Sequence, residues 1–264
     1  MHKRRAFTLI ELLVVIAIIA LLMSILMPAL QRVRKQSKEV VCRSNLRHWG
    51  LIWSMYCSEN KDKFMKGGYV SPSPSNQSWV EALRPYYSNP NIRVCPTATK
   101  PVSESGGSYG TFTAWGIFGR YNDRSWGGPE VEGDYGSYGI NEFAYDSLPF
   151  VPRVEQYWRT VNVKGRNNIP LFLDCVWFDV WTDDTNPPPA YYGDVNGEMK
   201  TVCINRHDGY INCLFFDWST RKVGLKELWT LKWHKSFNTA GPYTLAGGVQ
   251  AGDWPDWMRS FKEY

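Results

Sequence analysis

Residues 3–11 read KRRAFTLIE, and residues 12–30 continue as LLVVIAIIALLMSILMPAL. Only Ser24 and Pro28 interrupt the apolar run from Leu12 to Leu30, which is therefore long enough to cross a membrane as a helix. A cleaved secretory signal is the alternative. Its apolar part is usually only about 7 to 15 residues long and precedes a small-x-small site, and no such site follows here. The stretch predicts a transmembrane helix near the N-terminus.

Glu11 lies between the basic leader and the apolar run. In one interpretation it completes a capping box, because residues 8–11 fit the S/T-x-x-E pattern of a helix start, where backbone N–H groups need acceptors. A cap does not account for an acid on the membrane side of the leader. Burying a carboxylate there is costly unless a partner offsets the cost.

The order of a basic leader, a small residue, Phe7, Thr8 and Glu11 before an apolar helix resembles the class III leader of type IV pilins and type II secretion pseudopilins. The resemblance implies that a prepilin peptidase cleaves between Ala6 and Phe7 and methylates the new amino group of Phe7. The family usually has Gly before the cut, and Ala6 keeps a small residue there. The resemblance also implies that Glu11 meets the N-terminal amine of a neighbouring subunit, which would offset its burial cost.

By the same resemblance, the chain is a structural subunit of a type IV pilus-like or type II secretion pseudopilus filament. It would span the inner membrane once, with its N-terminus in the cytoplasm and its C-terminal domain in the periplasm. The implied partners are other pilin-like subunits, the prepilin peptidase, the inner-membrane assembly machinery and membrane lipid. Basic residues flank the apolar run on both sides, so charge alone does not set the orientation. These flanking basic residues supply much of the net charge of +5, so the positive charge does not indicate a nucleic-acid partner and none is expected.

The length of 264 residues suits one membrane helix and one globular domain. We expect a cleaved leader at residues 1–6, a transmembrane and assembly helix at 7–30, an amphipathic continuation at 31–62 and a globular periplasmic or extracellular domain at 63–264. In the continuation, apolar side chains recur every three or four residues and predict one buried stripe: Cys42, Leu46, Trp49, Trp53 and Tyr56. A single rod from Phe7 to Asn60 would be about 80 Å long, and Pro28 would allow a kink or local melting.

Six cysteines are dispersed along the chain without a C-x-x-C motif, which argues against a zinc ribbon or a thioredoxin-type site. Cys42 and Cys57 would lie about 22 Å apart on one helix and cannot bridge each other. In an exported domain, a disulfide between Cys42 and Cys95 is the preferred pairing. Buried free thiols are the alternative.

The remainder predicts an α+β fold, in which the long helix packs on a small antiparallel β-sheet with long loop insertions. Strand signals occur at residues 138–141, 169–174 and 210–216, and the last strand turns at 217–220 to return along 221–224. Short helices are expected at 79–87 and near Leu225 to Trp229. Residues 103–139 and 182–197 read as insertions, and the Gly- and Trp-rich tail to Tyr264 is expected to wrap the surface.

His207, nine further residues and Asp217 resemble the His-x9-Asp-Gly element near the C-terminus of pilin-like proteins from planctomycetes and related bacteria. Trp218 stands in the place of the Gly, and Trp rarely adopts the positive φ of a tight Asp-Gly turn. His207, Asp208 and Asp217 could form a catalytic or metal site, but we favour local hydrogen bonds to the backbone.

The acids of the second insertion are weak calcium candidates: Asp183, Asp184 and Asp194, with Asn196 and Glu198 nearby. Their spacing misses the EF-hand pattern, so we expect no cofactor and keep calcium as the alternative. The chain contains no G-x-S-x-G, phosphate loop or H-E-x-x-H motif, and no enzyme is predicted.

Several of the 13 tryptophans lie in loop-like surroundings: Trp115, Trp126, Trp177, Trp181, Trp254 and Trp257. They could bind polysaccharide or a secreted protein, or they could anchor the insertions by packing inward, which we favour. A membrane-anchored binding domain is therefore the alternative to a filament subunit. A surface hydrolase that uses His207 and Asp217 is the third hypothesis.

Overall fold

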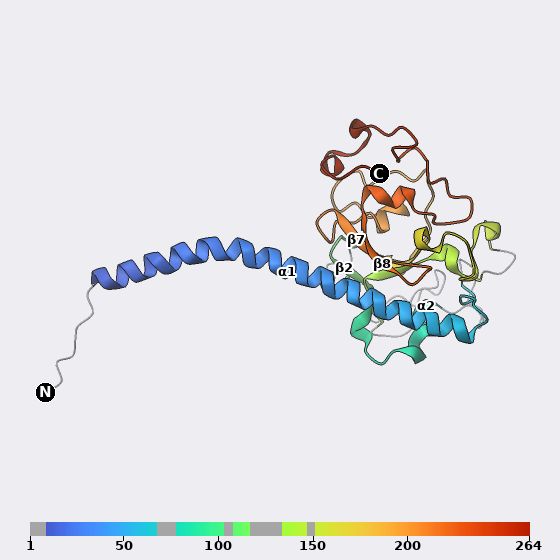
Figure 1. Ribbon diagram of the computed structural model, residues 1–264, viewed down its shortest axis with the longest axis horizontal. Coiled ribbons are helices and arrows are strands. Elements are labelled where there is room, and N and C mark those ends of the chain that lie inside the picture. The colour runs from blue at the N-terminus through green and yellow to red at the C-terminus, as the bar shows by residue number, and fades with distance from the viewer. Residues whose placement is uncertain (1–8, 68–77, 103–107, 117–133, 147–150) are drawn as a thin grey trace.

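The structure, a computed structural model, describes residues 9–67, 78–102, 108–116, 134–146 and 151–264. α1 (Leu9–Glu59) is a single helix of 51 residues, which corresponds to about 75 Å at 1.5 Å per residue. Figure 1 shows it as a gently curved rod, whose first part projects away from the globular part and whose second part lies against it. The helix continues on both sides of Pro28, so the local melting that the sequence allowed does not occur.

The second half of α1 packs through one face, as the spacing of its apolar residues predicts. Cys42, Leu46, Trp49 and Trp53 are fully buried, whereas Tyr56 is only half-buried. Ile52 and Cys57 extend the buried face. The stripe is therefore confirmed and is wider than predicted.

The main sheet has five strands, in the order β6 (Asp179–Val180), β4 (Tyr138–Asn141), β5 (Pro170–Asp174), β7 (Tyr210–Phe215) and β8 (Thr220–Gly224). β7 and β8 form the predicted hairpin, in which Tyr210 lies opposite Gly224 and Leu214 opposite Thr220. β4 and β5 are antiparallel, as are β5 and β7. α1 lies against β5, β7 and β8. The α+β class is thus confirmed.

Two parallel pairs depart from the purely antiparallel sheet that the sequence predicts. β6 runs parallel to β4, and β1 (Lys100–Pro101) runs parallel to β2 (Thr113–Gly116) in a small second sheet. β3 (Tyr135–Gly136) completes that sheet in the antiparallel sense. These short strands lie within the predicted insertions or directly before them. Their direction depends on the path of those insertions, which composition does not encode.

Short helical turns connect the strands. α2 (Trp79–Leu83) continues into η1 (Arg84–Tyr86), close to the predicted range of 79–87. The other turns are η2 (Pro90–Arg93), η5 (Glu142–Ala144), η6 (Val154–Gln156), η7 (Arg166–Asn168), η8 (Met199–Thr201), η9 (Lys226–Thr230), η10 (Ala251–Asp253) and η11 (Asp256–Met258).

The main sheet is covered on both faces. Phe172 of β5 packs with the helix residues Trp49 and Trp53, whereas the next residue, Leu173, belongs to a second hydrophobic core. Successive side chains of a strand point to opposite faces, so the two cores lie on opposite sides of the sheet. The C-terminal region contributes large side chains to the second core: Trp229, Trp233, Trp254 and Met258. The prediction that the tail only wraps the surface is therefore wrong.

Candidate assembly helix and buried side-chain cluster

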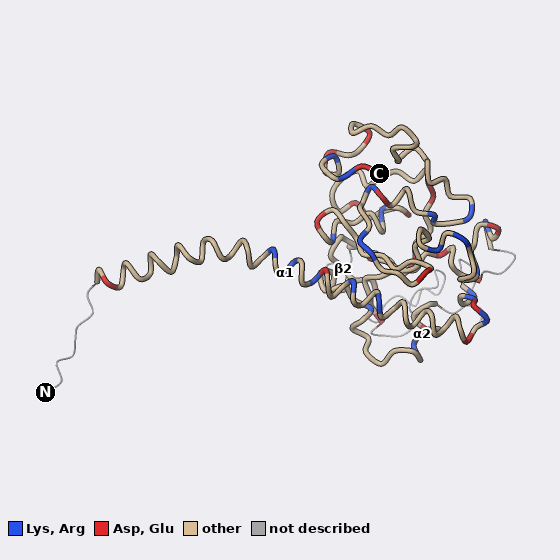
Figure 2. The backbone as a smooth tube through the Cα atoms, viewed as in Figure 1, with Lys and Arg blue, Asp and Glu red and all other residues tan. Residues whose placement is uncertain are grey.

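The first half of α1 is apolar and uncovered. From Leu12 to Leu30 its large apolar side chains are 45 to 68% exposed. Among the described residues, α1 is the one helix with a segment long and apolar enough to cross a membrane, and none of that segment is buried. Figure 2 shows the projecting part without charge between an acidic position near its start and basic positions near the globular part. This surface suits lipid or other apolar helices.

The predicted assembly residue, Glu11, belongs to this half, and the predicted processing residues precede it in the sequence. Ala6 and Phe7 lie outside the described residues. Glu11 lies in the first turn of α1, and its side chain is exposed. The assembly role of Glu11 requires a second subunit and stays a prediction.

A second feature lies where α1 meets the sheet. Four buried side chains from distant parts of the chain place their ligand atoms within 4.8 Å of one another. This Cys–His–Asp cluster consists of Cys42, Cys95, Asp174 and His207. Cys42 comes from α1, Cys95 follows η2, Asp174 ends β5 and His207 precedes β7. The cluster therefore joins the helix to three segments of the globular part.

The polar contacts of the cluster converge on a small volume. His207 Nε2 lies 3.2 Å from Asp174 Oδ2 and 3.6 Å from Cys95 Sγ. Cys42 Sγ lies 3.5 Å from each oxygen of Asp174. A tight loop orients His207, since its N–H donates to the Tyr210 carbonyl oxygen at 3.2 Å and Gly209 adopts φ +92°.

Arg206 and Tyr138 support the cluster from outside. The Arg206 guanidinium donates to the carbonyl oxygens of Thr111, Ser137, Thr113 and Cys175, and its Nη1 lies 3.4 Å from Asp174 Oδ1. The Tyr138 hydroxyl lies 3.3 Å from Cys42 Sγ. Because the guanidinium is held by backbone acceptors, it places a fixed positive charge beside Asp174.

The cluster shifts the pKa values of its own members. Burial would raise the pKa of Asp174, but His207, Arg206 and the Asn212 N–H lower it to about 2. Burial would lower the pKa of His207, yet the Asp174 carboxylate raises it to about 10. Burial also raises the pKa of Cys42 well above its usual value. Without a metal, the cluster therefore holds an imidazolium beside an ionised carboxylate.

The geometry does not match a catalytic relay. In such a relay one ring nitrogen of His faces the nucleophile and the other faces the acid. Here the same Nε2 faces both Cys95 and Asp174, and these two side chains are fully buried. The arrangement is better suited to hold a proton or a metal ion between these atoms than to activate a nucleophile.

The predicted Cys42–Cys95 disulfide does not form in the structure, where all six cysteines are free and buried. The structure nevertheless places the two residues in one cluster. The Cys42 and Cys95 side chains contact each other as thiols. Cys42 Sγ also contacts Asp174, and Cys95 Sγ contacts His207 and, at 2.9 Å, the Thr97 hydroxyl.

His207 and Asp217 do not form one site, because they flank opposite ends of β7. Asp217 accepts hydrogen bonds from the N–H and the hydroxyl of Ser219 at 3.0 and 2.6 Å, as favoured for a turn residue. Asp208 is exposed and pairs with Lys35 of α1 at 3.6 Å. Trp218 does adopt a positive φ of +66°, so the tight turn forms without Gly. A hydrolase built on His207 and Asp217 together is excluded by this placement.

The calcium candidates also separate. Asp183 and Asp184 approach His234, whereas Asp194 accepts from the Lys200 amine at 2.8 Å and from the Ala190 N–H at 3.1 Å. Asp183 also pairs with Arg153 at 2.7 Å. Asp194 is not among the residues that approach His234, and Asp183 and Asp194 each pair with a basic side chain, so the three acids do not share one calcium-like arrangement.

The tryptophans of the insertions mostly anchor them. Trp115 and Trp254 are buried, and the Trp115 indole donates to the Tyr138 carbonyl oxygen at 2.8 Å. Trp177, Trp181 and Trp257 are partly buried against the two cores. Trp126 lies outside the described residues. Trp115 and Trp254 are therefore not part of an exposed platform for sugar rings.

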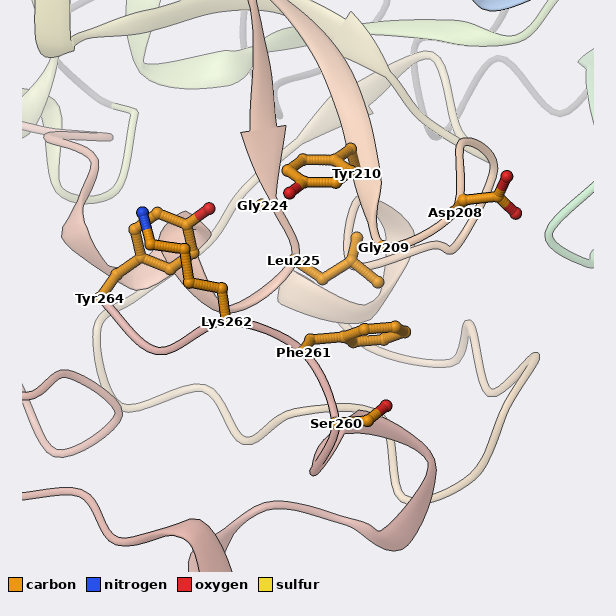
Figure 3. A pocket seen from close by; sticks show the side chains of 9 residues that line it. All are labelled: Asp208, Gly209, Tyr210, Gly224, Leu225, Ser260, Phe261, Lys262 and Tyr264. Carbon is orange, nitrogen blue, oxygen red and sulfur yellow. The ribbon is translucent and has the colours of Figure 1, made fainter. Parts of the chain in front are cut away.

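A pocket lies beside the loop that carries His207 (Figure 3). Tyr210 and Leu225 line one side, and the C-terminal residues Phe261, Lys262 and Tyr264 line the other. Its volume of about 230 Å³ is below the range of about 300 to 1,000 Å³ that is typical of ligand pockets. The pocket therefore reads as a packing gap under the C-terminal tail.

Comparison with known families identifies the N-terminal segment. Residues 1–27 match the prokaryotic N-terminal methylation motif. The match covers the leader, Phe7, Glu11 and most of the apolar run, and in this segment the chain is similar to type IV pilins and pseudopilins. Comparison of the chain with curated proteins and with solved structures found no match.

Sequence reasoning singled out three members of the buried cluster and missed Asp174. The available signal was an acid at the end of an apolar strand, since residues 170–173 read PLFL and are all buried. A charge that ends such a strand needs a partner, because an isolated buried carboxylate is costly. The sequence does not reveal that the partners are His207 and Arg206.

Proposed function

We propose that this chain is a structural subunit of a type IV pilus-like or type II secretion pseudopilus filament. The observation that carries the proposal is the methylation motif at residues 1–27 on a helix whose first half stays uncovered. Exposed apolar surface of this extent requires lipid or other subunits to cover it. Both are available to a membrane-anchored pilin-like protein before and after assembly.

Processing prepares the helix for assembly. The prepilin peptidase removes residues 1–6 and methylates the amine of Phe7. Residues 7–30 hold the subunit in the inner membrane, residues 31–62 connect the membrane helix to the globular part, and residues 63–264 lie in the periplasm or on the filament surface. The inner-membrane assembly machinery then moves the subunit from lipid into the filament.

Assembly replaces lipid with neighbouring helices. One apolar patch of each helix would contact a different patch on the helix of the next subunit. When such contacts repeat without closing into a ring, they produce a helical fibre. Glu11 would pair with the Phe7 amine of a neighbour, which neutralises both charges inside the apolar bundle.

Replacement of Glu11 tests this proposal. Glu11→Gln should leave membrane insertion intact and abolish incorporation into filaments, because the amide no longer neutralises the amine. Glu39→Gln is the matched control on the same helix, since Glu39 pairs with Lys222 of β8 within its own chain at 2.7 Å. Sheared filament fractions and membrane fractions are compared by immunoblot. Normal incorporation of the Glu11→Gln subunit would refute the assembly role.

A further inference from the structure

The Cys–His–Asp cluster has the composition of a metal centre. Two thiols, an imidazole nitrogen and a carboxylate oxygen are the ligand types that bind Zn²⁺, and four ligands complete its tetrahedral shell. We propose that Cys42, Cys95, Asp174 and His207 together bind one structural zinc ion, which fastens α1 to the globular part.

The distances within the cluster fit a tetrahedron around zinc. With usual zinc–ligand distances, the edge between nitrogen and oxygen is about 3.4 Å, and an edge from sulfur to either is about 3.6 Å. The structure has 3.2 Å between His207 Nε2 and Asp174 Oδ2, 3.6 Å between Nε2 and Cys95 Sγ, and 3.5 Å between Cys42 Sγ and Asp174 Oδ2. These three edges match the expected lengths, and all four ligand atoms lie within 4.8 Å of one another.

Hydrogen bonds alone serve this geometry less well. A protonated Nε2 has a single hydrogen, yet it faces both Asp174 and Cys95. The N–H···O contact to Asp174, at 3.2 Å, is at the long end of the usual range. A zinc ion at the centre would satisfy all four ligand atoms, and its binding would release to solvent the protons that these atoms carry.

The charges balance once the ion is bound. Two thiolates and the Asp174 carboxylate carry three negative charges, and Zn²⁺ leaves one of them uncompensated. The Arg206 guanidinium, 3.4 Å from Asp174 Oδ1, supplies the missing positive charge. A buried charge requires such compensation, and here it is built into the fold.

A second layer of hydrogen bonds orients the ligands. The Asn212 N–H donates to Asp174 Oδ2 at 2.9 Å. The Thr97 hydroxyl lies 2.9 Å from Cys95 Sγ, and the Tyr138 hydroxyl lies 3.3 Å from Cys42 Sγ. Outer partners of this kind fix the direction of metal ligands and stabilise thiolates.

The ion would have a mechanical role. Cys42 is the first fully buried residue of α1, so the site lies where the uncovered half of the helix begins to meet the sheet. A zinc ion there would hold the helix to β5 and to the loop before β7. The site is independent of Phe7 processing, so its failure and failure of the filament proposal are distinguishable.

The test uses the full chain purified in detergent without chelator. Metal analysis should find about one zinc per chain. Replacement by Co²⁺ should produce thiolate-to-cobalt charge-transfer bands and the visible bands of tetrahedral cobalt. Cys42→Ser should reduce bound zinc at least about tenfold, whereas Cys57→Ser, a buried cysteine on the same helix outside the cluster, should retain it.

A thiol count keeps the test decisive if Cys42→Ser does not fold. The wild-type chain is chelated, denatured without reductant and alkylated, and mass spectrometry should find all six cysteines modified. A Cys42–Cys95 disulfide would overturn the proposal. So would a folded wild-type chain that binds no zinc or cobalt when either is supplied, or a folded Cys42→Ser chain that binds zinc as tightly as the wild type.

Discussion

The two halves of α1 have similar apolar side chains in opposite surroundings. Leu26 in the first half is 63% exposed, whereas Leu46 in the second half is fully buried. In the second half, apolar residues recur every three or four positions and cover one face of the sheet, whereas the apolar window of the first half is not buried against any of the described residues. The apolar character of the first half therefore does not serve the fold of a single subunit. It suits lipid and other subunits.

A substitution at Trp49 should produce the largest difference between the halves. Trp49 packs against Trp79, Tyr87 and Phe172, and its indole donates to the Ile92 carbonyl oxygen at 2.8 Å. Trp49→Ala should therefore lower the free energy of unfolding of the globular part by about 3 to 5 kcal/mol.

Leu26→Ala is the control in the exposed half and should leave that free energy unchanged. Denaturant titration of both variants in detergent, followed by tryptophan fluorescence, measures the difference. Equal stability of the two variants would mean that the packing of Trp49 does not stabilise the globular part.

Close packing at Gly50 gives a smaller effect. A Cβ at Gly50 would lie 3.0 Å from Leu214 Cδ1 of β7, which is tighter than ordinary contact. Gly50→Val should therefore destabilise the globular part by about 1 to 3 kcal/mol through overpacking, despite the low helix propensity of Gly. Ala20→Val in the uncovered half should have no effect in the same titration. A Gly50→Val chain as stable as the wild type would show that the helix lies farther from β7.

The sequence could predict those parts of the fold that depend on residues close together in the chain. The α1 stripe and the β7–β8 hairpin depend on residue spacing and on turn residues close in sequence. The buried cluster depends on where Cys95, Asp174 and His207 meet in space, and no local pattern encodes that meeting. The sequence identified His207 but placed it with Asp217, because both belong to one recognisable element.

Backbone conformation at Trp218 illustrates a second reason. The propensity of Trp argues against positive φ, but the residue adopts +66° and its ring packs partly against the core around α1. Tertiary packing can offset a local strain of about 1 to 2 kcal/mol. The sequence also failed to predict the second core. A Gly- and Trp-rich tail has no helix or strand period that would mark its buried residues.

The smallest effect should come from the ion pairs that join α1 to the sheet region. Glu39 is largely buried and pairs with Lys222, so Glu39→Gln should cost at most about 1 kcal/mol. Lys35 and Asp208 are 69% and 78% exposed in their pair, and Lys35→Ala should change stability by less than about 0.5 kcal/mol. Titrations at low and high salt measure both. A large loss with Lys35→Ala would contradict the view that α1 is held by its apolar stripe.

Mass spectrometry of the mature N-terminus tests the central claim most directly. The chain is expressed in cells that contain a prepilin peptidase, extracted from their membranes and digested. The account predicts that the first peptide begins with N-methylated Phe7 and lacks residues 1–6. A peptide that begins at Met1 in the same cells would contradict it.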